Sequence, residues 1–330
     1  GDDRQLVEAI RQLSPDVVVA DPGLVDPAAA HATTILALDT RESVASLRSA
    51  IRVGAGGYYL WPGDRDDLAT AVAATVVAPV SHDRRAVVVA VHGARGGVGA
   101  TFVATHLAAA FARRGSCIVL DADPLYGDVS AAVGMPQEGL HTLADLAPMA
   151  DELTSVQLDE ALWVHPDGFG VLAGPPPERA DEIAPEALSQ VIRVAAAGSD
   201  AVVLHLPRAL DGLARAGLRS SDRAIEVLSL DVLSFRAATR ALEALDPLGI
   251  TARVGFVVNR SARGEITVGD VTRVFDVQPL AVLPVDRAVA RAQDHGRLMP
   301  AKGRTGRRFD RLATKLLEKT DGADERVAAS

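Results

Sequence analysis

The hydrophobic positions of the chain form short apolar runs that alternate with helix-forming stretches. The runs are rich in β-branched residues and predict buried strands at 86–91, 117–121, 201–205 and 255–259. Helices are expected at 101–114, 139–146, 185–197, 209–219, 234–245, 267–275, 286–295 and 305–318, with a hairpin over 163–173. Alternation of strand and helix predicts an α/β protein.

The N-terminal part shows the same alternation and looks like a separate domain. Candidate strands lie at 15–21, 34–38 and 54–61, between helix-forming stretches at 4–13, 42–52 and 65–77. We therefore expect a domain with a parallel sheet over 1–80, a linker over 81–85 and a second domain over 86–318. The polar residues 319–330 are expected to be a disordered tail. The chain starts at Gly1 rather than at methionine, so a preceding segment is also expected.

A glycine-rich loop joins the strand at 86–91 to the helix at 101–114. Residues 91–102 read Val-His-Gly-Ala-Arg-Gly-Gly-Val-Gly-Ala-Thr-Phe. Backbone N–H groups in such a loop and the positive end of the helix favour phosphate. An ordinary strand–helix turn is the alternative. The predicted nucleotide-binding residues here are Gly93, Ala94, Arg95, Gly96, Gly97, Val98, Gly99, Ala100, Thr101 and Phe102.

This loop lacks the lysine of an ordinary phosphate-binding loop. Such a loop ends in Gly-Lys-Ser/Thr, and its lysine holds the β- and γ-phosphates. Thr101 keeps the hydroxyl, but Ala100 stands at the lysine position. One charged hydrogen bond contributes about 1.5–3 kcal/mol, and the guanidinium of Arg95 offers partial compensation. Nucleotide binding should be weakened, and hydrolysis should suffer most because charge at the γ-phosphate must be neutralised.

Two later strands end in side chains that could carry chemistry. Asp121 and Asp123 follow the run at 117–121, where carboxylates face the ligand crevice of a parallel sheet, or else cap the next turn. His205 ends the run at 201–205. A neutral imidazole lacks the negative charge that orients a metal's hydration shell, and an imidazolium repels the metal. We therefore expect His205 to be a hydrogen-bonded strand-end histidine rather than a metal ligand.

The loop Arg-Gly-Gly-Val-Gly-Ala-Thr resembles the deviant Walker loop, Lys-Gly-Gly-x-Gly-Lys-Thr, of the MinD/ParA ATPases. The resemblance is greatest to the CpaE/TadZ branch of pilus-assembly and polar-localisation proteins, in which the second lysine is commonly lost. It extends over roughly residues 84–318, and the segment 200–207 is similar to the Walker B strand. The resemblance implies a P-loop NTPase domain with three α/β/α layers and a mostly parallel sheet. The implied cofactors are ATP or ADP and Mg²⁺.

The resemblance also implies roles for residues around the phosphates. Arg95 stands where the family has a signature lysine that reaches the partner's nucleotide across a dimer. Thr101 and Asp121 would hold Mg²⁺, the aspartate through water, and Asp123 would be the catalytic residue that orients the attacking water. His205 departs from the pattern, because the Walker B strand usually ends in aspartate.

Two further segments are similar to the family's base-binding segments. In Gly-Phe-Val-Val-Asn-Arg, the asparagine is Asn259 and the arginine is Arg260. The resemblance implies that Asn259 recognises adenine, since an amide both donates and accepts hydrogen bonds. Leu-Pro-Val-Asp, which contains Pro284, is similar to the segment that closes over the base.

The N-terminal domain resembles a response-regulator receiver, a flavodoxin-like domain that also precedes the ATPase domain in the CpaE/TadZ branch. Asp21 matches the phospho-acceptor, but Trp61 replaces the receiver's lysine and no strand with an acidic pair is visible. We expect a degenerate receiver that makes contacts and is not phosphorylated on Asp21. Trp61, with Tyr58 and Tyr59, either forms an aromatic edge for a protein partner or packs inside the domain.

Composition narrows the choice of partners. A net charge of −9 argues against general affinity for nucleic acid. The basic cluster Arg304, Arg307, Arg308 and Arg311 is expected to be a solvated helix face rather than a DNA or lipid patch. The sequence has a single cysteine, Cys117, and therefore no disulfide framework, which is typical of cytosolic proteins. It contains no run of 18 apolar residues, so no membrane-spanning helix is predicted.

These features together predict an ATP-binding localisation or scaffold protein of the MinD/ParA type with weak or absent hydrolysis. It would form a homodimer across the nucleotide face and recruit secretion, pilus or division machinery in the cytoplasm, at a pole or septum. DNA is not expected as a partner, and membrane contact would at most be peripheral. One alternative is a slow ATPase in which Asp121 and Asp123 carry the chemistry. Another is a ParA-like DNA-associated partition factor, which requires an exposed arginine cluster.

Overall fold

The computed structural model describes residues 6, 17–25, 34–41, 43–76, 86–136, 138–262 and 264–327. The chain divides into two compact units, Gly1–His82 and Asp83–Ser330. The division falls inside the segment 81–85, which was predicted to be a linker and lies outside the described residues.

The smaller unit contains a parallel sheet in the order β1-β2-β3. Its elements are β1 (Val17–Ala20), the short 3₁₀ helix η1 (Pro22–Leu24), β2 (Thr34–Asp39), α2 (Val44–Arg52), β3 (Tyr58–Leu60) and α3 (Arg65–Val76). The helix expected at 4–13 lies, apart from residue 6, outside the described residues. Asp21 accepts a hydrogen bond from the Gly23 amide and caps η1, and Trp61 is about half exposed. That Asp21 is not phosphorylated stays a prediction.

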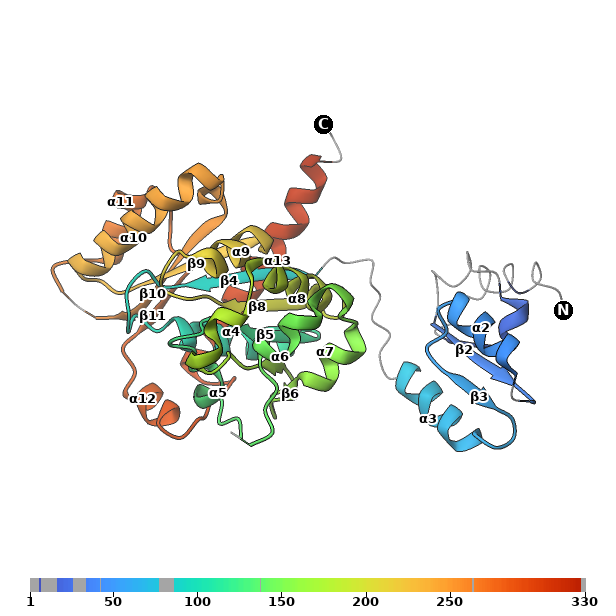
Figure 1. Ribbon diagram of the computed structural model, residues 1–330. Coiled ribbons are helices and arrows are strands. Elements are labelled where there is room, and N and C mark those ends of the chain that lie inside the picture. The colour runs from blue at the N-terminus through green and yellow to red at the C-terminus, as the bar shows by residue number, and fades with distance from the viewer. Residues whose placement is uncertain are drawn as a thin grey trace. The chain divides into compact units, whose positions relative to one another are not determined.

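The larger unit is built on an eight-stranded sheet with the order β11-β10-β9-β4-β8-β5-β7-β6 (Figure 1). Its strands are β4 (Val87–His92), β5 (Cys117–Asp121), β6 (Trp163–Val164), β7 (Gly170–Leu172), β8 (Ala201–His205), β9 (Arg223–Leu228), β10 (Val254–Ser261) and β11 (Ala281–Pro284). All neighbours pair in parallel except β6 and β7, which form the expected hairpin. The predicted α/β fold with a mostly parallel sheet is confirmed.

Helices cover both faces of this sheet. The α-helices are α4 (Ala100–Ala112), α5 (Val129–Ala132), α6 (Leu143–Leu146), α7 (Ser155–Ala161), α8 (Pro185–Ala197), α9 (Gly212–Ser220), α10 (Val232–Leu245), α11 (Val268–Phe275), α12 (Arg287–Gln293) and α13 (Arg304–Val327). Short 3₁₀ helices are η3 (Ala147–Glu152), η4 (Pro177–Glu182), η5 (Asp246–Leu248) and η6 (Thr251–Arg253). None of the described helices combines the length and the apolar composition needed to cross a membrane.

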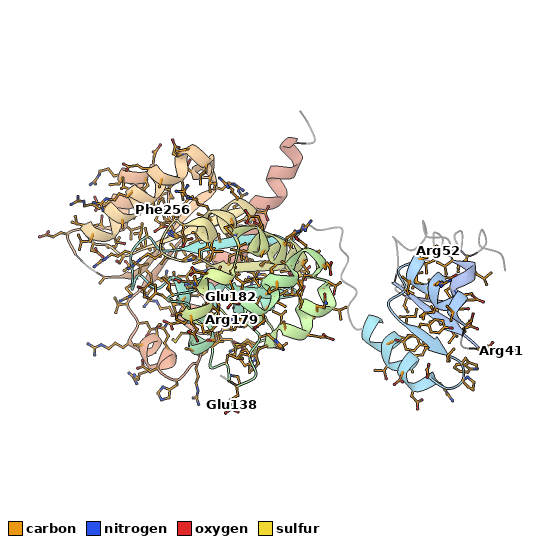
Figure 2. The ribbon with its side chains drawn as sticks, in the orientation of Figure 1. Arg41, Arg52, Glu138, Arg179, Glu182 and Phe256 are labelled. Atoms are coloured by element: carbon orange, nitrogen blue, oxygen red, sulfur yellow. The ribbon has the colours of Figure 1, made fainter. Side chains whose placement is uncertain are left out.

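The two faces of the central strand β4 bury different cores. Val89 and Val91 belong to the cluster beneath α4 and α13, whereas Val88 and Ala90 belong to the cluster beneath α8 and α9. Because both faces are covered, β4 is a continuous apolar run rather than an alternating one. Phe256 of β10, labelled in Figure 2, belongs to a third cluster beneath α10 and α11.

The C-terminal helix differs from the prediction in length. Phe309, Leu312 and Leu316 of α13 are buried against the sheet, so this stripe is core, as expected. The folded domain was expected to end at residue 318 with a disordered tail, whereas α13 continues to Val327. No Gly or Pro interrupts the sequence between 307 and 321, and the helix continues through Gly322.

Candidate nucleotide-binding site

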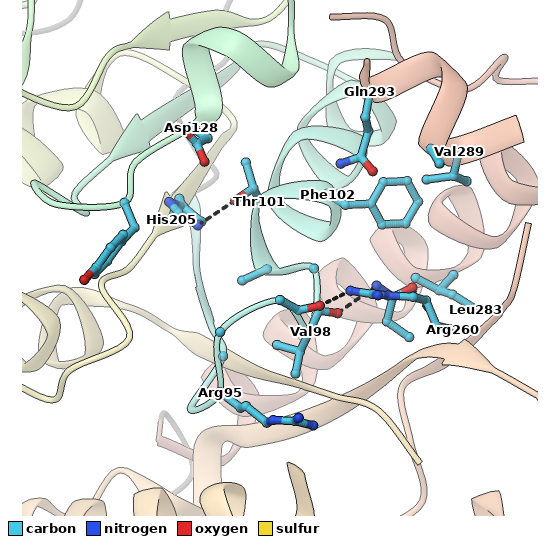
Figure 3. A pocket seen from close by; sticks show the side chains of 18 of the residues that line it. Arg95, Val98, Thr101, Phe102, Asp128, His205, Arg260, Leu283, Val289 and Gln293 are labelled. Carbon is cyan, nitrogen blue, oxygen red and sulfur yellow. Dashed lines mark hydrogen bonds between the residues drawn. The ribbon is translucent and has the colours of Figure 1, made fainter. Parts of the chain in front are cut away.

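The glycine loop lies between the end of β4 and the start of α4, in the middle of the sheet (Figure 3). Gly97 and Gly99 have φ angles of +78° and +95°, in the left-handed region that other residues avoid. A Cβ atom on Gly99 would lie 2.3 Å from the side-chain nitrogen of Asn259. The loop conformation therefore depends on glycine at both positions.

The helix that follows the loop is fixed by burial. Residues 102–111 of α4 are all buried, and Phe102 packs edge-on against Phe309. His106 accepts a hydrogen bond from the Met299 amide at 3.0 Å, and its other ring nitrogen lies 2.9 Å from the Phe102 carbonyl. Burial lowers the pKa of His106 to about 4, so this ring is neutral at pH 7. The N-terminus of α4 is thus held rigidly toward the loop.

A pocket of about 650 Å³ opens beside the loop and the start of α4. It brings together most of the predicted site residues, including Thr101, Asp123, Asn259, Arg260 and Pro284. Two predicted residues do not line it. The Ala94 amide donates instead to Glu226 at 2.8 Å, and Asp121 is buried behind His205.

Arg95 does not point toward the space beside Thr101. Its Nη1 lies 2.8 Å from Asp231 Oδ1, and both side chains are about 41% exposed. Figure 3 shows the Arg95 side chain directed away from Thr101 and Phe102. Asp231 caps α10 by accepting from the Ser234 amide, so it is itself fixed. Arg95 thus lines the pocket, but Asp231 holds its guanidinium away from Thr101.

Asn259 and Arg260 support the loop from the end of β10. The buried Asn259 side chain donates to the Val98 carbonyl at 2.8 Å and accepts from the Arg260 amide at 2.9 Å. Arg260 has a φ of +51°, and its guanidinium donates to the Gly97 carbonyl. The amide that the resemblance assigns to adenine is thus bonded to the loop backbone, and adenine recognition stays a prediction.

His205 joins two side chains that were expected to hold Mg²⁺. Its Nδ1 lies 2.8 Å from Asp121 Oδ1, and its Nε2 lies 3.2 Å from Thr101 Oγ1. Burial opposes charging of the ring, but the Asp121 carboxylate outweighs it and raises the pKa of His205. His205 is hydrogen-bonded at the strand end, as the sequence predicts. The residues do not fit Mg²⁺, because an imidazole lies between the two expected ligands.

Asp123 caps the turn that follows β5. Its Oδ1 accepts hydrogen bonds from the amides of Leu125 and Tyr126, at 3.1 and 2.9 Å. The capping alternative for this carboxylate is thus what the structure shows. Asp123 also lines the pocket, but its role in positioning water stays a prediction. Within the described part of the chain, no group of three or more His, Cys, Asp or Glu side chains is arranged to hold a metal ion.

Three arginines line the pocket besides Arg95, and sequence reasoning missed two of them. Arg208 and Arg287 were not predicted, whereas Arg260 was. Arg208 Nη1 lies 3.2 Å from where a Cβ on Gly96 would be, and its guanidinium carbon lies 5.6 Å from the centre of the Tyr126 ring. Arg208 directly follows the His-Leu-Pro segment, and this adjacency was the signal that could have revealed it.

A buried pair behind the loop was also missed. His92 Nδ1 lies 2.5 Å from Glu226 Oε2, and His92 Nε2 lies 3.1 Å from the Arg208 carbonyl. Burial opposes the charged ring, but Glu226 outweighs it and raises the pKa of His92. Because Glu226 also accepts from the Ala94 amide, this pair ties the first turn of the loop to the segment that carries Arg208.

The sequence was compared with family models and with curated proteins. No family model matches the sequence. An uncharacterized protein of Mycobacterium tuberculosis is 29% identical over 259 residues, which cover 78% of this chain and 72% of that protein. An uncharacterized ATP-binding protein of Methanocaldococcus jannaschii is 27% identical over 216 residues, 64% of this chain and 79% of that protein.

Solved structures also resemble the chain. A ParA family ATPase from Chlorobium tepidum superposes with a TM-score of 0.64 at 20% identity, covering 70% of this chain and 98% of that one. The septum site-determining protein MinD of Pyrococcus horikoshii, complexed with Mg-ADP, gives 0.59 at 23% identity and covers 70% and 95%. The larger unit has the fold of the MinD/ParA-type P-loop ATPases. The sequence relatives support that family, while the CpaE/TadZ branch and the receiver-like unit stay proposals.

Proposed function

We propose that the chain is an ATP-binding localisation or scaffold protein of the MinD/ParA type, from the CpaE/TadZ-like branch, with weak or absent hydrolysis. One observation carries the proposal. The glycine loop has the conformation of a phosphate cradle at the start of α4, whereas Ala100 and His205 stand where the hydrolytic charges would be. Nucleotide binding and hydrolysis depend on different parts of the site. The chain would therefore bind nucleotide while hydrolysing it weakly or not at all.

Binding would rely on the loop backbone and on arginines around the pocket. The start of α4 and the loop amides favour an anion without any lysine. Arg208, Arg260 and Arg287 line the pocket and add positive charge. Arg208 is the best placed to replace the lost lysine, because its Nη1 lies beside Gly96. A guanidinium is well suited to phosphate oxygens.

Hydrolysis would fail for three reasons that act together. Ala100 offers no cation at the γ-phosphate, where charge develops in the transition state. Asp121 is bonded to His205, and Asp123 caps the turn after β5. A group already engaged in such contacts must break them before it orients water.

The rim of the pocket suits a homodimer across the nucleotide face. Leu125, Tyr126 and Val285 are 59%, 64% and 56% exposed, and the last two line the pocket. Exposed apolar side chains that cluster around a site are typical of protein interfaces. We propose that this face pairs with a second copy of the chain. The smaller, receiver-like unit would contact secretion, pilus or division machinery at a pole or septum.

Titration calorimetry with ATP and with ADP tests the proposal, comparing wild type with Gly99→Val. The valine would clash with Asn259 and force a strained φ, so binding should disappear. Gly139→Val is the matched control, because Gly139 also has a positive φ of +70° but lies outside the pocket. Equal heats for wild type and Gly99→Val would refute nucleotide binding at the loop.

A slow cycling ATPase is the second candidate, and a DNA-associated partition factor is the third. Arg304, Arg307 and Arg311 of α13 are exposed, which supports the DNA candidate, whereas Arg308 is half-buried and donates to the Val282 carbonyl. A net charge of −9 opposes it. Salt-dependent DNA binding that is lost in the triple alanine variant would favour this candidate.

A further inference from the structure

The position that the family resemblance assigns to Mg²⁺ lies between the ends of β5 and β8 and the first turn of α4. Asp121 of β5 and His205 of β8 are direct partners in the parallel ladder, so their side chains lie side by side. The His205 ring reaches from Asp121 Oδ1, 2.8 Å away, to Thr101 Oγ1, 3.2 Å away. Each ring nitrogen therefore contacts one of the two side chains that would hold Mg²⁺.

Three donors already engage the Asp121 carboxylate. Its Oδ1 accepts from the Asp123 amide as well as from His205, and its Oδ2 accepts from the Val129 amide at 3.1 Å. The backbone of Gly127 also covers it, because a Cβ there would lie 2.7 Å from Oδ2. Asp121 is 1% exposed. Mg²⁺ demands near-octahedral geometry at about 2.0–2.1 Å and usually keeps several waters. A buried carboxylate that already accepts from three donors and lies against Gly127 is poorly suited to hold that shell.

We propose that this pocket binds its nucleotide without Mg²⁺, because the His205 imidazole occupies the metal position and bonds both expected ligands. The inference rests on the proposed nucleotide binding and specifies its cofactor requirement. The phosphates are then neutralised by protein groups alone, which are the loop amides and the pocket arginines, Arg208 foremost.

Calorimetric titration of the full chain with ATP, in excess MgCl₂ and again in excess EDTA, tests the inference. The wild-type dissociation constants should agree within about twofold. His205→Asp restores an acid beside Asp121, so its affinity should be about tenfold higher with Mg²⁺ than with EDTA. His141→Asp makes the same change at an exposed histidine outside the pocket and should behave like wild type.

Thermal melting gives a second readout. In His205→Asp, the new carboxylate lies beside that of Asp121. Without nucleotide, Mg²⁺ should therefore raise the melting temperature of this variant and leave the melting temperature of wild type unchanged. If His205→Asp does not fold, the wild-type ratio of affinities alone decides. A wild-type affinity that falls tenfold or more in EDTA would overturn metal independence while leaving nucleotide binding intact. Absence of ATP binding in both buffers would overturn the proposed function and this inference with it.

Discussion

The loop side of the pocket (residues 93–101) and the strand-end side (Asp121 and His205) differ in how far they match the sequence prediction. On the loop side, Gly97 and Gly99 keep their left-handed conformations and α4 starts at the expected position. On the strand-end side, Asp121 is bonded to His205 rather than left to face a metal. In the proposed function, phosphate would bind through the backbone of the loop, which does not require the side chains of Ala100 or His205. Hydrolysis would depend on charges placed by side chains, and single substitutions suffice to remove such charges.

Restoring the charges should have the largest effect. The double variant Ala100→Lys with His205→Asp should raise phosphate release about 100-fold over wild type, because donors that stabilise transition-state charge typically contribute 10²–10³-fold. A malachite-green assay with ATP and Mg²⁺ measures this. The matched control, Ala252→Lys with His141→Asp, makes the same changes at exposed positions outside the pocket. Unchanged turnover in the first variant would mean that these positions do not explain the loss.

The two sides of the pocket were also unequally predictable from sequence. The loop, its strand and its helix are local in the chain, so apolar runs and glycines sufficed to place them, as they did for Asp121 and Asp123 at a strand end. The sequence predicted His205 to be a satisfied histidine but did not identify its partners. Those partners are Asp121 and Thr101, 84 and 104 residues away, which only the sheet order brings together.

The contacts of two arginines could not be predicted from the sequence, for a similar reason. Arg95 was assigned to a contact with the partner's nucleotide across a dimer, which stays a prediction, but its pair with Asp231, 136 residues away, was not foreseen. Arg208 had no motif of its own and gains its position from the end of β8. Side-chain direction on a loop depends on such distant partners, and periodicity carries no information about them.

Stability of the loop side should depend on a neutral His106. Its pKa falls from about 6.5 unfolded to about 4 folded, so the stabilisation is complete above pH 6.5 and is lost as the pH drops toward 4. Between pH 7 and pH 5 the free energy of unfolding should fall by about 2 kcal/mol from this group. Urea denaturation of wild type and His106→Gln measures the difference. A slope that is identical in the two proteins would contradict the assignment, and His141→Gln should leave the slope unchanged.

Removing the proposed substitute for the missing lysine should weaken binding moderately. Arg208→Ala should raise the dissociation constant for ATP about tenfold, as expected for one charged hydrogen bond. Arg193→Ala, an exposed arginine on α8 outside the pocket, serves as the control in the same fluorescent-nucleotide titration. An unchanged constant in Arg208→Ala would show that the loop backbone alone binds the phosphates.

Releasing Arg95 should have the smallest effect. Asp231→Asn keeps the cap of α10 and removes the ion pair, which is worth at most about 1 kcal/mol at an exposed site. With Arg95 free to reach a partner's nucleotide, sedimentation velocity in ATP should show dimerisation tightened severalfold. Weaker dimerisation in Asp231→Asn would mean that the Arg95–Asp231 pair itself belongs to the interface.

The fate of bound ATP tests the central claim most directly. The protein is incubated with ATP, separated from free nucleotide by rapid gel filtration, and the bound nucleotide is identified by ion-exchange chromatography over several hours. The intact loop and the altered strand ends predict close to one bound nucleotide per chain, which remains ATP throughout. The Gly99→Val variant, incubated in the same way, measures the background breakdown of ATP. Accumulation of bound ADP to one per wild-type chain, at a rate above that background, would contradict the account.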